Sequence, residues 1–477
     1  VMGNTISTAF SSDSLSIEQD STKIIPDEKV IVNQIIIIGN KITKAKIITR
    51  ELAVQEGDQI SSEQIPDILA QGENNLMNTR LFNSAQIDLV YESPSQANII
   101  IEVDERWYIF PSPILETGER NFNDWWKNSR WDFSKAYYGG RVMWENVRGL
   151  NDRLLFKAQF GFIKSFDIDY KIPYINKAQT LGVSFFAGYR ENRSFQYTIN
   201  KKVNKEDSSE NQLIFLEKSP EEGDLGVSRR RRSGGMAFFY RPDLYNYHNF
   251  SIQYYNAEIS DTIAEHLNPD YFLNGNNSQK FLALTYTYRI EKRDYVSYPL
   301  RGYFFELYLQ KLGLGVFNDI NQLNVSAAIA KYLDLGNGFF LSGRLEGKSS
   351  LAKKVPYNQL PALGFGNDLV RGFELYVIPG QHYILQKTTF KKRLLSVKKD
   401  FKFIPVKQFR TIPLDIYLKT FFDSGYASFQ DNLEAVSSPL SNRYHWGTGL
   451  GLDIVTFYDT LFGLEFSLNS INETAFR

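Results

Sequence analysis

The sequence predicts an all-β transmembrane barrel of about 16 antiparallel strands, preceded by one small α+β domain. Three observations lead to this fold class. From Trp107 to the end of the 477-residue chain, apolar and polar residues alternate in segments of roughly ten residues, as expected of strands with one lipid-facing and one wet side. Aromatic residues make up 15% of the chain, which strands and membrane interfaces both favour. The first hundred residues instead show helical periodicity between short strands.

Composition excludes several other classes of protein. Lys+Arg and Asp+Glu both number 54, so the net charge is zero and there is no global basic surface for nucleic acid. The chain has no cysteine, which excludes disulfides, thiolate metal sites and a cysteine nucleophile. The purest apolar run, Ile35 to Ile38, is far shorter than the roughly 18 residues that a membrane-spanning helix needs. The N-terminus shows no signal-like pattern, so we expect any export signal to have been removed.

The pattern divides the chain into three regions. Residues 1–27 are rich in Ser, Thr and Asp and are expected to form a disordered lead-in. The pattern in residues 28–106 predicts a small domain with the element order β-α-α-β-β. Residues 107–477 predict the barrel.

Turn and capping signals place the elements of the small domain. Ile31 to Ile38 is a β-branched run that ends at a turn signal, Gly39-Asn40. Thr43 is expected to cap the first helix, and Ser61 with Gln64 has the capping-box spacing of a second helix. Two strands are expected to complete the domain, at about 85–91 and 98–103.

Period-two alternation places the barrel strands. In the segment 281–290, one face carries Leu284 and Tyr286, while the other carries Thr285 and Arg289. About fifteen candidate strands follow this pattern, near 107–116, 137–147, 153–163, 165–174, 179–190, 233–241, 248–259, 279–291, 302–312, 320–333, 338–349, 382–394, 412–423, 444–456 and 461–471. Bacterial single-chain barrels have even strand numbers. Either one strand is therefore missed, or the closing strand lies beyond Arg477.

A large soluble β-sandwich or barrel would also alternate between apolar and polar residues. Many of the candidate strands, however, carry several charges on the face opposite the apolar one. A closed polar lumen accommodates such a face best, so the membrane barrel is the favoured interpretation.

Short motifs of the N-terminal domain occur in a fixed order. They are the strand ending in Gly39-Asn40, Arg50-Glu51-Leu52, the Gly57-Asp58 turn, Leu81-Phe82 and the strand from Ile99 to Glu105. In this order they resemble a POTRA domain, the periplasmic unit of the BamA/TamA insertase superfamily in the outer membrane of Gram-negative bacteria. The single copy departs from the multi-module chains of the major insertases, which leaves the class of client open.

Two barrel motifs strengthen the resemblance. Leu369-Val370-Arg371-Gly372-Phe373, preceded by Leu363-Gly364 and Gly366-Asn367, is similar to the family's signature loop, which folds back into the lumen and would here span about 355–381. Phe421-Phe422-Asp423-Ser424-Gly425 is similar to a second motif, with Phe421, Asp423 and Gly425 as its matching residues on a late strand. A weaker match is Arg293-Asp294, followed by Pro299 and Gly302, between two mid-barrel strands.

Parity along the segment 414–423 supports a pairing of the two motifs. Asp423 shares a face with Tyr417 and Lys419 and is therefore expected to face the lumen. A guanidinium from the loop would form a charge-assisted, bidentate bond with this carboxylate. The resemblance implies Arg371 as that guanidinium, with Val370, Gly372 and Phe373 completing the loop tip. The alternative is an exposed loop arginine without a partner.

Other clusters have simpler interpretations. Arg229 to Arg232 is expected in a solvated loop, in a hairpin at about 191–232 that projects beyond the membrane; binding of lipid phosphates suits it better than binding of nucleic acid. Trp125, Trp126 and Trp131 predict an aromatic belt at the interface rather than a carbohydrate platform. The four histidines show no metal spacing, and no hydrolase or dinucleotide motif occurs. We therefore expect no enzyme, no cofactor and no metal.

The resulting hypothesis is assembly of barrel proteins in the outer membrane, or translocation of polypeptide across it, by lateral opening and β-strand addition. Pro111 and Pro113 would weaken pairing at the seam formed by the first strand. The expected partners are unfolded outer-membrane or surface polypeptides, accessory periplasmic lipoproteins and outer-membrane lipid, but no nucleic acid. The alternatives are a dedicated secretion pore for one partner protein and a passive porin.

Overall fold

The computed structural model describes residues 28–117, 136–193, 195–201, 214–218, 227–317, 319–360, 362–364, 368–401, 403–404, 410–429, 438–456 and 460–476. The expected lead-in at 1–27 and the tryptophans at 125, 126 and 131 lie outside these residues. Within the described ranges, no helix has the length and apolar character needed to cross a membrane.

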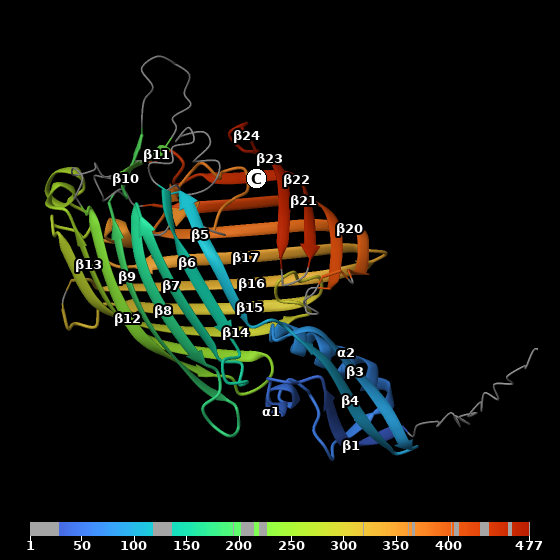
Figure 1. Ribbon diagram of the computed structural model, residues 1–477. Helices are drawn as coiled ribbons and strands as arrows, with labels where there is room; N and C mark the ends of the chain where they lie inside the picture. Colours follow the sequence, from blue (N-terminus) through green and yellow to red (C-terminus); the bar gives the residue numbers. More distant parts are fainter. Residues whose placement is uncertain are drawn as a thin grey trace, which may run out of the picture.

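The N-terminal domain is a four-stranded sheet with its helices packed on one side (Figure 1). The strand order is β2-β1-β4-β3, and β1 runs parallel to β4. Ile47, Ile48 and Leu76 from the helices are buried against Val32 and Ile101 of the sheet, which forms a separate hydrophobic core. The elements are β1 (Lys29–Ile38), α1 (Ala45–Thr49), β2 (Gln59–Ser61), a 3-10 turn (Ser62–Gln64), α2 (Ile65–Asn78), β3 (Phe82–Ser93) and β4 (Gln96–Glu105).

Both capping expectations in this domain are wrong. The residue before α1 is Lys44, and the Thr43 hydroxyl instead lies 3.0 Å from the hydroxyl of Tyr108 and accepts a hydrogen bond from Asn146 Nδ2 at 2.9 Å. Ser61 makes no side-chain capping bond, because its segment forms the short strand β2 that pairs with β1. Tertiary partners thus compete successfully with local capping.

Among the described residues that follow this domain, one antiparallel sheet of sixteen strands curves round into a barrel (Figure 1). All fifteen expected strands occur. The sixteenth is β24 (Thr474–Phe476), which pairs with β23 over three residues and is too short to show alternation. The described residues thus reach an even number of strands, and β24 is the strand that the alternation did not detect. The other barrel strands are β5 (Ile109–Thr117), β6 (Ala136–Glu145), β7 (Arg153–Gly161), β8 (Ile163–Ile172), β9 (Leu181–Asn192), β12 (Arg229–Tyr240), β13 (Asn246–Ile259), β14 (Ser278–Arg293), β15 (Gly302–Leu312), β16 (Gln322–Gly336), β17 (Phe339–Leu351), β20 (His382–Asp400), β21 (Thr411–Ser428), β22 (Tyr444–Thr456) and β23 (Leu461–Asn469).

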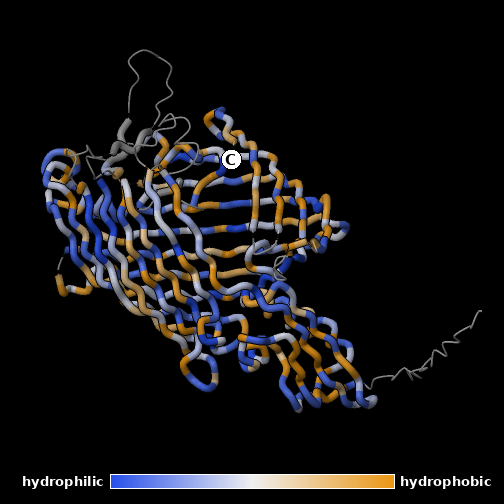
Figure 2. The backbone as a smooth tube through the Cα atoms, in the orientation of Figure 1, coloured by the Kyte–Doolittle hydropathy of each residue, from blue (hydrophilic) through white to orange (hydrophobic). Residues whose placement is uncertain are grey.

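The two faces of the barrel wall differ as the alternation predicts. On β21, Leu418 and Phe422 are 46% and 43% exposed on the outside, whereas Phe421 and Asp423 are buried on the inside. Figure 2 shows hydrophobic and hydrophilic residues alternating along the strands. The exterior is thus apolar, and the polar groups gather in the interior.

The N-terminal domain is held against the turns at one rim of the barrel. Arg241, in the turn after β12, donates two hydrogen bonds of 2.7 Å to the carboxylate of Glu51. Arg50 donates to the carbonyl of Gln179 at 2.8 Å, in the turn after β8. Burial acts to lower the pKa of Arg241, but the adjacent Glu51 carboxylate outweighs it and holds that pKa above its ordinary value. The domain is therefore docked by a buried, charge-assisted contact.

The opposite rim carries longer connections. Between β9 and β12, a small hairpin of β10 (Gln196–Lys201) and β11 (Ile214–Lys218) extends beyond the barrel wall (Figure 1). A π-helical turn (Thr262–Leu267) lies between β13 and β14.

The expectation that Arg229 to Arg232 forms a solvated loop is wrong. These arginines are the first four residues of β12, and Arg230 and Arg232 form ion pairs with carboxylates of the neighbouring strands β9 and β13 at 3.2 and 3.0 Å. Cross-strand pairing with opposite charges allows this basic run to enter the sheet.

Candidate functional site

The connection between β17 and β20 folds back into the barrel. It contains a 3-10 turn (Tyr357–Gln359) and the short paired strands β18 (Ala362–Leu363) and β19 (Ile378–Pro379). Its Val370 and Phe373 are each 1% exposed and belong to a buried cluster that includes Tyr383 of β20 and Ala427 of β21. We call this connection the lumenal loop. Hydrophobic burial seats it against the inner wall.

The loop tip ends in a bidentate ion pair. Arg371 Nε donates to Oδ2 of Asp423 at 2.7 Å, and Nη2 donates to Oδ1 at 2.6 Å. Asp423 is completely buried, and the Arg371 guanidinium lies 3.7 Å from the ring centroid of Phe421. Such a pair combines a directional hydrogen-bonding fork with a cation–π contact. The structure thus brings together residues from the two predicted motifs.

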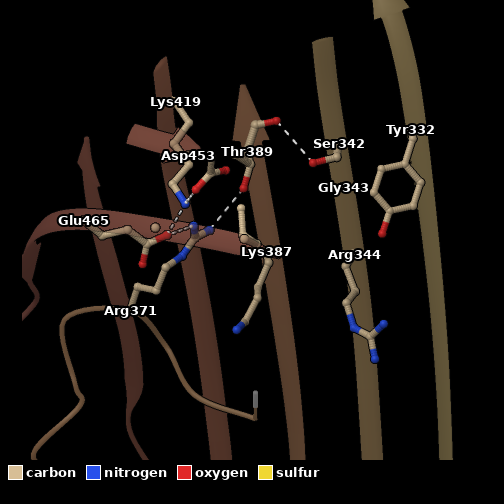
Figure 3. A pocket seen from close by; sticks show the side chains of 12 residues that line it. Tyr332, Ser342, Gly343, Arg344, Arg371, Lys387, Thr389, Lys419, Asp453 and Glu465 are labelled. Atoms are coloured by element: carbon tan, nitrogen blue, oxygen red, sulfur yellow. Dashed lines mark hydrogen bonds and ion pairs between the residues drawn. The ribbon is translucent and has the colours of Figure 1, made fainter. Parts of the chain in front are cut away.

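A wider charge network surrounds the Arg371 side of this ion pair (Figure 3). Arg371 Nη1 lies 3.3 Å from Glu465 of β23, and the same carboxylate accepts a bond of 2.6 Å from Lys419. Lys419 also donates to Asp453 of β22 at 2.6 Å. These groups line a cavity of about 430 Å³ inside the barrel. Since Lys419 binds two carboxylates and Arg371 binds two, charges on β21, β22 and β23 are joined through the loop.

Glycines on the inner face of β22 make room for the loop. A Cβ atom at Gly447 would lie 1.8 Å from the Arg371 carbonyl oxygen, and one at Gly449 would lie 2.7 Å from the Phe421 ring. The backbone of Gly372 has φ +98°, and its carbonyl accepts a hydrogen bond of 2.7 Å from Asn469. A side chain at Gly447 would displace the loop, and one at Gly449 would crowd the Phe421 ring that lies beside the Arg371 guanidinium, so both glycines are part of the site.

Sequence reasoning missed several of these residues. Lys419 was placed on the lumenal face without a role, and Glu465, Asp453 and Asn469 were not singled out. The detectable signal was the alternation Gly447, Gly449 and Gly451 within one strand, because glycine is depleted in strand interiors unless a backbone approaches closely. Gly425, which was predicted, lies under the loop: a Cβ there would be 2.9 Å from the Val370 side chain.

Pro111 and Pro113 lie at the other end of the sheet, on β5. The amide of Glu145 donates to the carbonyl of Tyr108 at 2.8 Å, and the same register places Pro111 opposite Val142. In an antiparallel pair, hydrogen-bonded and non-bonded positions alternate. Pro111 and Pro113 therefore occupy positions that are not hydrogen-bonded to β6. The backbone N and C=O groups of these residues point toward the free edge of β5. Because proline has no backbone N–H, that edge lacks two hydrogen-bond donors.

The two ends of the sheet are β5 and β24. In the part of the chain that the structure describes, these strands form no ladder with each other. On the far side of the seam, β24 is held to β23 by only three residue pairs.

Comparison with known proteins adds two family matches. A model of the POTRA surface antigen variable number repeat matches residues 30–106, and a model of the Omp85 superfamily domain matches residues 146–456. No curated protein is detectably similar in sequence.

Solved structures with a similar fold include CdiB from Escherichia coli, with 13% identity and a TM-score of 0.53 over 92% of this chain and 72% of that chain. BamA from Haemophilus ducreyi lacking POTRA domains 1-3 aligns with 15% identity and a TM-score of 0.49 over 94% of this chain and 83% of that chain.

Proposed function

Because the chain belongs to the Omp85 superfamily and carries one POTRA domain, it is an outer-membrane barrel that serves as an insertase or translocase, and we propose that it acts by opening between β5 and β24. An opened seam offers two strand edges to a client polypeptide. A client hairpin that pairs with such an edge avoids exposing unpaired backbone groups to hydrocarbon, each of which costs several kcal/mol.

The observation that carries this proposal is the incomplete pairing at the seam. The free edge of β5 lacks the donors of Pro111 and Pro113, and no ladder joins β5 to β24 among the described residues. A closed barrel stabilised by a full-length ladder would resist opening. A seam with few hydrogen bonds opens at lower cost, and an incoming strand competes with it more easily.

The lumenal loop would hold together the strands β21 to β23, which form the barrel wall beside the seam. Arg371 contacts Asp423 on β21 and Glu465 on β23, and therefore spans β22 between them. β23 is the neighbour of the terminal strand β24. Anchoring the loop would thus hold the last strands in register while β5 moves away from them.

The POTRA domain would lie in the periplasm and supply a second pairing edge. Its twelve-residue strand β3 is at the end of the sheet order β2-β1-β4-β3, so one side of β3 has no partner strand among the described residues. Extended clients or accessory lipoproteins could add a strand there. The apolar exterior of the barrel would contact outer-membrane lipid.

Restoring the seam donors tests the mechanism. The double variant Pro111→Val and Pro113→Val keeps the β5–β6 ladder, whose bonds use the alternate residues, and adds two donors at the free edge. We expect slower client insertion with normal amounts of folded barrel. Pro413→Val on β21, away from the seam, is the matched control. Unchanged client handling in the double variant would contradict opening at this seam.

Depletion in the native host separates the classes of function. Outer-membrane proteomics should then show a broad loss of barrel proteins for a general insertase. Loss of one surface protein would identify a dedicated secretion pore, and an unchanged outer membrane would identify a passive porin and refute the proposal.

A further inference from the structure

The turn between β14 and β15, residues 294–301, is a preformed rigid unit. Oδ1 of Asp294 accepts hydrogen bonds from the amides of Tyr295 and Leu300, at 2.8 and 3.0 Å. The turn is closed by the Asp294 amide, which donates to the carbonyl of Arg301 at 3.1 Å. Gly302 follows with φ +98°, and a Cβ there would lie 1.9 Å from the Lys292 carbonyl. The turn is thus held in one conformation by its own hydrogen bonds.

One end of this turn is bound to the POTRA domain. Asn78, the last residue of α2, donates from Nδ2 to the carbonyl of Asp294 at 2.9 Å and accepts from the amide of Val296 at 2.9 Å. Both bonds use backbone groups of the turn. Asn78 therefore binds the turn through the backbone, so these two hydrogen bonds do not depend on which side chains the turn carries.

The middle of the turn reaches the inner wall of the barrel. The hydroxyl of Tyr298 donates to Oδ2 of Asp453 at 2.8 Å. The Tyr298 ring lies 5.1 Å from the ring of Tyr417, and Lys391 Nζ lies 3.7 Å from its centroid. Tyr298 is 8% exposed and Asp453 is 4% exposed. The contact is thus buried and is fixed by three separate groups of the wall.

Asp453 is also part of the network that holds the lumenal loop. Its Oδ1 accepts from Lys419, and Lys419 is shared with Glu465, which contacts Arg371. We propose that Tyr298 is a positioning residue that couples docking of the POTRA domain to the hold on the lumenal loop. The connection runs from Asn78 through the turn to Asp453.

The charges explain why one hydroxyl would matter. With the Tyr298 bond in place, Asp453 is partly satisfied, so Lys419 can serve both Asp453 and Glu465. Without it, Lys419 is drawn toward Asp453, and Glu465 then competes with Asp423 for the guanidinium of Arg371. In a buried network, the loss of one hydrogen bond changes the strength of the neighbouring ones.

Thiol labelling of the loop in the full chain tests the coupling. The protein has no cysteine, so Leu369→Cys, at a loop position that is 6% exposed, introduces a single reporter. Relative to this reporter protein in lipid bilayers, Tyr298→Phe should raise the rate of reaction with a maleimide by about five- to tenfold, the equivalent of one hydrogen bond. Asn78→Ala, in the POTRA domain, should raise it similarly.

Two controls make the result specific. Tyr288→Phe removes a tyrosine hydroxyl that donates to Asn246 at 2.7 Å on another part of the wall, and it should leave the rate unchanged. The double variant Asn78→Ala with Tyr298→Phe should react no faster than the quicker single variant, because both act on one connection. Unboiled samples on gels confirm that each barrel is folded.

Unchanged labelling in either single variant would overturn the coupling. Multiplying rate effects in the double variant would also overturn it, since they would show independent contributions. The readout needs no client, so it distinguishes failure of this coupling from failure of the proposed insertase or translocase function.

Discussion

Arg371 on the lumenal loop and Asp423 on β21, 52 residues apart in the chain, are joined by two parallel hydrogen bonds of 2.7 and 2.6 Å. The carboxylate has no exposed surface, and the arginine is 8% exposed. Removing Arg371 would leave the buried Asp423 carboxylate without its ion-pair partner, and removing Asp423 would leave Arg371 paired with Glu465 alone, so this pair offers the sharpest tests of the site.

Arg371→Ala should destabilise the folded barrel by up to about 3–5 kcal/mol, with the lower end expected because a 430 Å³ cavity adjoins the pair. Asp423→Ala should produce the same loss of heat resistance, and the double variant should be scarcely worse than either single one. The exchange Arg371→Asp with Asp423→Arg should recover only part of the function, because the fork geometry is not reproduced. Gel-shift melting measures the effect; strictly additive losses would show that the two residues act independently.

Gly447→Ala should unseat the loop while leaving the strand ladder intact. The new Cβ would lie 1.8 Å from the Arg371 carbonyl oxygen, so loop or strand must shift, at a cost of about 1–3 kcal/mol. Gly343→Ala, also in the wall of the cavity but with no atom within 4 Å of the added Cβ, is the matched control. Equal melting temperatures for the two variants would argue against the close approach at Gly447.

Arg241→Ala should release the POTRA domain from the barrel rim. Glu51, whose side chain is 3% exposed, would lose its bidentate partner, and the docked state should weaken by about 3 kcal/mol. The double variant Glu51→Met with Arg241→Met should remain better docked than Arg241→Ala, since neither residue of the pair is then left charged without the other. Hydrogen exchange of α1 amides reports docking, and unaltered exchange in Arg241→Ala would contradict the role of this pair.

The fragment 28–106 should fold and remain soluble when produced alone, because its sheet and helices enclose their own core. The structure adds that Tyr108 belongs to this core and donates to the Leu81 carbonyl at 3.1 Å. A fragment that ends at residue 108 should therefore melt at a higher temperature than one that ends at 106. Circular dichroism and sedimentation decide; an aggregated or unfolded fragment would count against the domain boundary.

Proteases added to intact cells should cut first in the connection between β9 and β12. The β10–β11 hairpin lies at the rim opposite the POTRA domain, and the segment between its strands carries Lys and Asp residues that a lipid face would exclude. The turn 294–301 at the other rim serves as the internal comparison and should be protected. Cleavage there before the hairpin would reverse the orientation of the barrel.

The sequence alone determined the repeating parts of this protein. Period-two alternation placed fifteen of the sixteen barrel strands, and helical periodicity with turn signals located the small N-terminal domain. Parity on one strand was enough to direct Asp423 inward. These properties are local, since alternation depends only on whether successive residues of one segment face lipid or lumen.

Only the tertiary structure decided what the interior and the rims hold together. The shared Lys419, the contacts of Glu465 and Asp453, and the reach of Tyr298 across the barrel all join residues far apart in sequence. Thr43 and the arginines of β12 were misread for the same reason: their partners come from other segments. A pattern within one segment reports which side is buried, but the partner of a buried polar group depends on which strands the fold makes neighbours.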